Sequence, residues 1–353
     1  MDSVMALPGP PASVITDRLS ISSLRPGNAR QQGMGNAGLT FADDISLIEH
    51  NPAGLGLIRN PLHSSSFLLF YEPLLPSAQL SQLFLLNLAY CFKPVSNDYG
   101  GFSITSRRLT FGPNSFTDED GRTVAYTRDV LSEFSLGWGM NFDVFGWEKQ
   151  CIGVKLKFVG GPDYLEEARI QRIGLLFDAG FHCTLPGNFR LAAVVGNVGM
   201  RIDSVEYNAI RQVIGDNEDL YYRGGFSVGE GKSLTPTEIS VGVGYGSVFS
   251  FIRSGSVKLN TEWNMAKRFS FNHASMGNGL KTGSGVEIDW FTRVLTRVGI
   301  EYDFERYETF LSTGLGFRVF NHIQCDTYFR TSNQPESLEK HRYGFSVRGY
   351  NLF

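Results

Sequence analysis

The chain has 353 residues, a formal net charge of −3 and 19% charged residues. This balance excludes a polybasic nucleic-acid-binding protein and a chain kept disordered by its charge, so we expect no nucleic-acid partner. No apolar run approaches the roughly 20 residues that a membrane-spanning helix needs. Aromatic residues make up 13% of the sequence and glycine is frequent, which fits either a membrane β-barrel, whose strands alternate, or a soluble β-sandwich.

The first 60 residues are rich in Gly, Ala, Asn and Pro and differ from the rest of the chain. No Lys or Arg precedes Arg18, and Pro8, Pro10 and Pro11 interrupt the early apolar stretch. The start is therefore not a signal peptide as it stands. If the protein is exported, we expect a leader to have been removed or to lie upstream of this start.

A glycine-rich run at Gly33–Gly38 matches the pattern GxGxxG. A dinucleotide site would need a strand before this run and a helix opening at its third glycine. Neither is indicated, because residues 26–32 do not read as a strand. The glycines instead indicate close packing of a compact segment against other backbone.

Two aspartates, Asp43 and Asp44, follow in the same segment. They could act as a carboxylate pair for acid–base work or for a cation. An Asp pair at the start of a short helical turn, here residues 45–49, more often caps it and offsets its dipole, and we favour that interpretation. Residues 51–55, Asn-Pro-Ala-Gly-Leu, predict a turn that ends this short helix.

From residue 63 onward the sequence predicts an all-β chain of long alternating strands. In residues 150–159, for example, Ile152, Val154 and Leu156 face one way, whereas Lys155 and Lys157 face the other. Soluble strands usually have about 5–6 residues, whereas membrane strands need about 9–11. We expect about fourteen strands, near 63–72, 78–93, 99–112, 130–143, 148–161, 170–184, 188–202, 237–250, 255–264, 282–291, 294–304, 308–320, 321–332 and 341–352.

Two long polar connections, 113–127 and 204–236, interrupt these strands. The connections at 145–146 and 186–188 are much shorter. In a bacterial barrel, the first pair would be extracellular loops and the second pair would be short periplasmic turns, although the sequence itself does not give the sidedness.

The last predicted strand carries Tyr343, Phe345 and Val347 on one face and ends at Phe353. A terminal aromatic residue on an amphipathic strand is the usual ending of an outer-membrane barrel. Gly349 and Asn351 interrupt the apolar face, and a soluble β-protein that happens to end in Phe stays open. We expect the C-terminal assembly signal at Phe345, Val347 and Phe353.

No residue pattern indicates catalysis or a metal site. The cysteines Cys91, Cys151, Cys183 and Cys325 lie far apart, and no CxxC pair is present. We favour free thiols, although the sequence leaves a disulfide open. The six histidines form no HxH or HExxH cluster, so we expect no enzyme, no metal and no cofactor.

Residues 28–55 contain, in order, Ala-Arg, Gly-Met-Gly-Asn-Ala-Gly, Ala-Asp-Asp and Asn-Pro-Ala-Gly-Leu. This order resembles the N-terminal signature of the FadL/PorV-type outer-membrane proteins, with Asn36 in place of the commoner second glycine. Strand motifs such as 153–157, 193–199 and 297–302 are similar to successive strands of the PorV-like branch. The resemblance therefore covers almost the whole chain.

The resemblance implies a transmembrane antiparallel β-barrel of about fourteen strands that is plugged by an N-terminal hatch. We divide the chain into an N-terminal extension with the hatch at residues 1–60 and a barrel at residues 61–353. Residues 1–24 match nothing in the family, so the hatch itself would begin near residue 25. The hatch motif is expected at Arg30, Gly33, Met34, Gly35, Gly38, Asp43, Asp44, Asn51, Pro52, Ala53 and Gly54.

By the same resemblance, the chain would lie in the outer membrane of a double-membraned bacterium. It would take up hydrophobic small molecules such as long-chain fatty acids, with outer-membrane lipid and the barrel-assembly machinery as partners. The lumen arginines Arg297 and Arg318 could anchor a carboxylate, or they could pair with neighbours such as Glu301 and Asp303, which we favour.

An alternative function from another class is that of the PorV relatives, which serve type IX secretion and hold secreted cargo proteins on the cell surface. A third, weaker possibility is a structural or adhesive surface antigen. The sequence alone does not separate these functions, because all three use the same barrel.

Overall fold

The structure is a computed structural model, and it describes residues 28–40, 45–58, 65–73, 84–92, 100–110, 114–117, 123–127, 130–142, 148–164, 168–207, 231–234, 237–251, 255–269, 279–291, 293–319, 322–334 and 341–350. Short helices occur in the N-terminal part, namely α2 (Ala29–Gly33), the 3-10 helix η1 (Ile45–Glu49) and α3 (Gly54–Leu57). A further 3-10 turn, η4, spans Pro186–Asn188.

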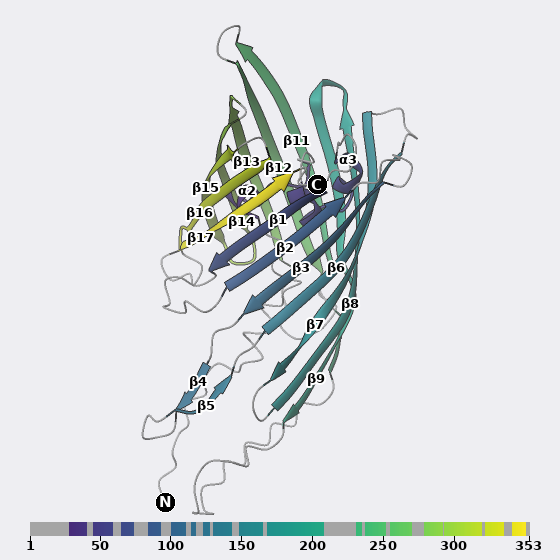
Figure 1. Ribbon diagram of the computed structural model, residues 1–353, viewed down its shortest axis with the longest axis vertical. Coiled ribbons are helices and arrows are strands. Elements are labelled where there is room, and N and C mark those ends of the chain that lie inside the picture. The colour runs from purple at the N-terminus through teal and green to yellow at the C-terminus, as the bar shows by residue number, and fades with distance from the viewer. Residues whose placement is uncertain are drawn as a thin grey trace, which may run out of the picture.

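Strands make up nearly all the rest of the described chain (Figure 1). They are β1 (Ser65–Pro73), β2 (Phe84–Phe92), β3 (Gly101–Thr110), β4 (Asn114–Thr117), β5 (Thr123–Thr127), β6 (Val130–Phe142), β7 (Glu148–Tyr164), β8 (Ala168–Leu185), β9 (Phe189–Tyr207), β10 (Gly231–Leu234), β11 (Thr237–Phe251), β12 (Gly255–Phe269), β13 (Leu280–Trp290), β14 (Val294–Asp303), β15 (Glu308–Val319), β16 (Ile323–Ser332) and β17 (His341–Tyr350).

Fourteen of these strands form one closed antiparallel barrel. The ladder runs β9-β11-β12-β13-β14-β15-β16-β17-β1-β2-β3-β6-β7-β8, and β8 pairs with β9 to close it. The short strand β10 pairs with β9 beyond this ring, and β4 with β5 forms a separate hairpin. The predicted fold class and strand number are confirmed. The predicted connection 113–127 contains the β4–β5 hairpin, and β9 extends to Tyr207, inside the predicted connection 204–236.

Outward and inward side chains alternate along every barrel strand with described side chains. Outward positions are apolar and exposed, as at Leu88, Phe158 and Leu311. Inward positions carry charged or polar residues that are buried, as at Lys155 and Arg297. A soluble β-protein has the opposite arrangement, so this is the surface of a barrel that spans a membrane. The described helices include none long and apolar enough to cross a membrane.

Aromatic side chains form a girdle near each end of this outward face. Stacked or tilted ring pairs occur near one end at Phe92–Phe102 and Phe189–Tyr245, and near the other end at Tyr71–Phe84 and Phe134–Phe158. Amphipathic rings of this kind lie at the boundary between the hydrocarbon and the head groups. The two girdles therefore mark the two membrane surfaces.

The two ends of the barrel differ in their connections. At the loop end, strands are joined by residues 74–83, 111–129, 208–236 and 270–279. At the turn end, they are joined by short stretches such as 186–188, 252–254 and 291–293. Strands β7, β8 and β9, with 17, 18 and 19 residues, extend beyond β1–β3 toward the loop end (Figure 1).

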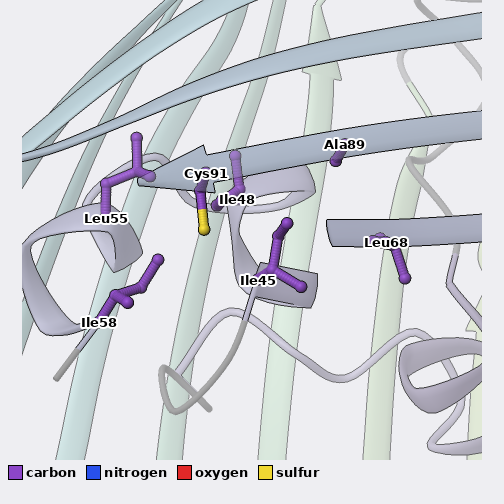
Figure 2. Packing of buried hydrophobic residues seen from close by; sticks show 7 residues of the cluster. All are labelled: Ile45, Ile48, Leu55, Ile58, Leu68, Ala89 and Cys91. Carbon is purple, nitrogen blue, oxygen red and sulfur yellow. The ribbon is translucent and has the colours of Figure 1, made fainter. Parts of the chain in front are cut away.

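The described residues before β1, namely 28–40 and 45–58, form an inner segment that packs against the inward faces of the strands. Helix α2 contacts β14–β17, whereas α3 contacts β3, β6 and β7. Ile45 and Ile48 pack on Leu68 and Ala89 of the wall (Figure 2). Helices of four or five residues are unstable alone, so the wall must hold them in place. The predicted boundary at residue 60 lies outside the described residues.

Candidate functional site

Glycines of the barrel wall allow the inner segment to approach the strands at backbone distance. A Cβ atom at Gly299 would overlap the backbone of Met34 and Gly35, and one at Gly285 would overlap Met34. Gly35 itself adopts a φ of +66°, which favours glycine. The predicted close packing of the Gly33–Gly38 run is therefore what the structure shows, and its partner surface lies on β13–β15.

A second set of wall glycines receives the turn that contains Asn51 and Pro52. A Cβ atom at Gly153 would overlap Pro52 and Ala53, and one at Gly180 would overlap the Asn51 amide. The Asn51 amide also donates to the backbone oxygen of Phe181 at 3.1 Å. This predicted motif therefore lies against β7 and β8.

A network of buried charges joins α2 to four barrel strands, β13, β14, β16 and β17. The guanidinium of Arg30 donates to both oxygens of Glu287, at 2.8 and 2.7 Å. Arg297 donates to the same carboxylate at 2.7 Å and lies 2.7 Å from Asp326. Arg348 in turn donates to Asp326 at 2.6 Å. Every member is at most 4% exposed, so solvent screens these charges weakly.

The two arginines that the sequence singled out have different surroundings. Arg297 is 1% exposed between two carboxylates, so its charge is already balanced by the protein. Its partners are Glu287 and Asp326 rather than Glu301 and Asp303. The Arg318 side chain is 28% exposed and lies 4.0 Å from Asp289. Their role as anchors for a ligand carboxylate stays a prediction.

Glu262 of β12 holds the part of the inner segment that follows α2. Its carboxylate accepts the backbone N–H groups of Gly38 and Leu39, each at 2.6 Å, and that of Thr40 at 3.0 Å. The Thr40 hydroxyl donates to the same carboxylate at 2.6 Å. Successive N–H groups that converge on one acceptor form an anion-binding nest, and here the anion is part of the wall.

Two more ionic contacts fix the inner segment elsewhere on the wall. Lys155 of β7 lies 3.4 Å from Glu49 of η1. Glu301 of β14 accepts from the Asn36 amide and lies 3.3 Å from Arg330. The inner segment is therefore tied to opposite sides of the lumen through side chains, in addition to its glycine contacts.

The structure brings most of the predicted hatch residues onto this one interface. Asp43, Asp44 and Phe353 lie outside the described residues, whereas Phe345 and Val347 face outward on β17, away from the site. Sequence reasoning missed the wall residues that hold the segment. The available signal was an acidic residue near the middle of a charged strand face, as at Glu262 and Glu287. No cluster suited to a metal ion occurs within the described part of the chain.

This chain resembles known proteins in its three-dimensional structure, whereas sequence comparison finds no match. No family model matches the sequence, and no curated protein matches it. The toluene transporter TbuX of Ralstonia pickettii superimposes with a TM-score of 0.51 and 13% identity, over 93% of this chain and 98% of TbuX. The P. putida toluene transporter TodX gives a TM-score of 0.51 and 11% identity over the same shares.

A Pseudomonas aeruginosa FadL homologue aligns over 92% of this chain and 97% of its own, with 14% identity and a TM-score of 0.44. The comparisons do not single out the PorV branch. Taken with the closed ladder of fourteen strands, they show that this chain has the fold of the FadL-type outer-membrane β-barrels.

Proposed function

We propose that this protein is an outer-membrane channel for hydrophobic small molecules, in which the inner segment acts as a removable plug. The solved structures that share its fold with a TM-score above 0.5 include two toluene transporters. The outward apolar face between two aromatic girdles supports a place in a membrane. By the connection lengths, we place the loop end outside the cell and the turn end in the periplasm.

The observation that carries this proposal is that the barrel and its contents are separate structures. The strand ladder closes through β8 and β9 without any contribution from the inner segment. The segment is held instead by side-chain contacts such as Arg30 with Glu287, and by glycines of the wall. Contacts of this kind can break and form again while the strand ladder stays intact. A plug that moves requires this property.

Among hydrophobic molecules, long-chain fatty acids are the proposed substrate class that can be tested at a particular residue. Long-chain fatty acids, the class that the sequence predicted, would need a cation for their carboxylate. Arg318 at the turn end is the more accessible of the two predicted anchors, because Arg297 is enclosed by carboxylates. We therefore propose Arg318 as the first anchor to test.

Whole-cell uptake tests the proposed function, because hydrophobic molecules cross phospholipid vesicles without a channel. Cells of a double-membraned bacterium without its own hydrophobic-uptake channels would express this chain and receive labelled toluene or oleate. We expect faster uptake than in cells that express a non-transporting barrel at the same level. The proposal would be refuted if, for toluene and for oleate alike, cells that express this chain took up the substrate no faster than cells that express the non-transporting barrel.

A variant that lacks residues 25–60 separates a plug from a structural core. We expect it to form a barrel that admits small hydrophilic solutes, since the lumen loses its contents. Mass spectrometry of molecules extracted from the purified intact barrel is the companion measurement. Enriched acyl species would support uptake, whereas a stoichiometric secreted protein in place of lipid would support the PorV-like alternative, which stays a prediction.

A further inference from the structure

A cluster of polar groups without hydrogen-bond partners lies on the inward face of β17, β1 and β2. Phe70 of β1 stands opposite Ser346 of β17 and opposite Asn87 of β2 in the ladder. Asn87 is fully buried, and both of its amide atoms lack a partner among the described residues. The Ser346 hydroxyl, on a residue that is 1% exposed, also lacks one within that part of the chain.

The next inward row toward the loop end adds an aromatic ring and two more polar atoms. The ring of Tyr328 stacks on that of Phe70, with centroids 6.5 Å apart and an angle of 25°. The Tyr328 hydroxyl lies beside the Glu72 carboxylate. These two groups partner each other, and Glu72 also accepts from the guanidinium of Arg342.

Buried polar groups without partners are costly, and they require an explanation. In this cluster, donors and acceptors surround a pair of stacked rings, which is the composition of a small-molecule site rather than of a core. From these groups, we propose that Phe70, Asn87, Tyr328 and Ser346 form a binding site for a neutral aromatic molecule that carries a hydroxyl group, of the phenol type.

The charges around the cluster decide between a neutral and an anionic ligand. The guanidinium groups around the cluster are paired with carboxylates. The pairs are Arg107 with Glu133, Arg330 with Glu301, Arg342 with Glu72 and Arg348 with Asp326. A ligand carboxylate would therefore enter a buried site without a cation to balance it, which is unfavourable. A phenol hydroxyl can both donate to and accept from the Asn87 amide, and its ring can pack on Phe70.

The position of the cluster places the site on the uptake route. Leu68 and Ala89, one inward row nearer the turn end, belong to the apolar cluster that contacts the inner segment (Figure 2). On β16, Arg330 donates to Gln32 of α2 at 3.4 Å, one inward row nearer the loop end than Tyr328, so the site lies beside the plug. The inference thus rests on the proposed function and adds to it a ligand class and the residues that recognise it. Because the groups are enclosed, the ligand enters only when a side chain such as Phe70 turns aside.

Equilibrium dialysis of the purified full chain in detergent tests this site. The probes are labelled p-cresol, toluene and benzoate at pH 7, which present the same ring with a hydroxyl, with no polar group and with a charge. We expect p-cresol to bind at least about 10-fold more tightly than toluene, and benzoate to bind no better than toluene. Equal binding of p-cresol and toluene would overturn the proposal, as would a preference for benzoate.

Substitutions test the individual residues. Comparing each variant with the parent in the same detergent also removes the contribution of probe that partitions into the detergent. Asn87→Leu should weaken p-cresol binding about 10- to 100-fold and leave toluene binding within about twofold. Ser346→Ala should have a smaller effect in the same direction. Ser312→Ala is the matched control, because the Ser312 hydroxyl also lacks a partner among the described residues but lies on β15, outside the cluster.

The stability of the variants separates a ligand site from trapped water. Asn87→Leu removes unpaired polar atoms, so we expect a folded barrel whose stability in the absence of ligand is unchanged or higher. If Asn87→Leu leaves the ratio of the p-cresol affinity to the toluene affinity unchanged, water alone satisfies the hydrogen bonds of these groups. If cells still take up toluene in that case, this inference fails and the proposed channel stands; if uptake is also absent, both fail.

Discussion

Glu287 is the residue at which the inner segment and the barrel wall share one charge. It receives Arg30 from α2 and Arg297 from the neighbouring strand β14, and all three are almost fully buried. A buried ion pair adds little to stability against an apolar pair of the same size, because desolvation offsets the attraction. Loss of one partner is different, since it leaves a charge buried without balance.

Glu287→Gln should therefore lower the free energy of unfolding by about 3–5 kcal/mol, because two guanidinium groups lose their shared carboxylate. Arg30→Met should cost less, since Glu287 keeps Arg297. The measurement is urea unfolding of the detergent-refolded barrel. Glu305→Gln, at an exposed turn residue, is the control and should stay within about 0.5 kcal/mol of the parent. Equal losses for Glu287→Gln and Glu305→Gln would contradict the network described here.

Helix α2 has its position set by the backbone of the wall rather than by its own length. Its five residues form less than two turns, and the Asn28 side chain caps its N-terminus by accepting the N–H of Gln31 at 3.0 Å. The residues that follow it lie directly on Gly285 and Gly299. A side chain at either glycine would thus push the element away from the wall, because backbone cannot move aside as a flexible side chain can.

Gly299→Ala should release α2 and leave the barrel assembled. We expect trypsin to cut after Arg30 in this variant but not in the parent, with cleavage followed by mass spectrometry and β-structure followed by circular dichroism. Gly196→Ala is the control, because the nearest atom to a new Cβ there is Asp178 Oδ1 at 3.4 Å, an ordinary contact. Resistance at Arg30 in both variants would show that the glycine contacts do not hold the segment.

The molecule as a whole has the dimensions of a membrane-spanning barrel. Strand β2 has 9 residues, and at about 3.3 Å per residue with a tilt of about 40° it spans roughly 23 Å, close to the apolar band of about 25 Å in such barrels. Val298, which is 65% exposed, lies near the middle of this outward band on β14. Lipid contact at that depth makes a charge costly.

Val298→Arg should reduce the free energy of folding into phospholipid bilayers by about 2–4 kcal/mol. Thr309→Arg, an outward position near the loop end of β15, should cost no more than about 1 kcal/mol because its charge can reach the interface. The comparison uses reversible unfolding titrations of both variants in the same lipid. Equal costs at the two depths would place the outward face outside the hydrocarbon.

Period-2 alternation is a local property, so the sequence alone predicted much of the wall. The outward set in β7, with Ile152 and Phe158, and the inward set in β14, with Arg297 and Glu301, point as predicted. The number of strands followed from the same pattern. The function of the inner segment did not follow from it, because no periodicity marks residues 28–58.

The sequence by itself determined that this chain forms a fourteen-strand barrel with an N-terminal motif like that of the FadL-type proteins. Only the tertiary structure decided which groups meet: Arg30 with Glu287, the nest at Gly38–Thr40 with Glu262, and Phe70 with Tyr328. These partners lie more than 200 residues apart in the chain. They are brought together by strand register and by closure of the ring, which depend on all fourteen strands at once and leave no trace in any short stretch of sequence.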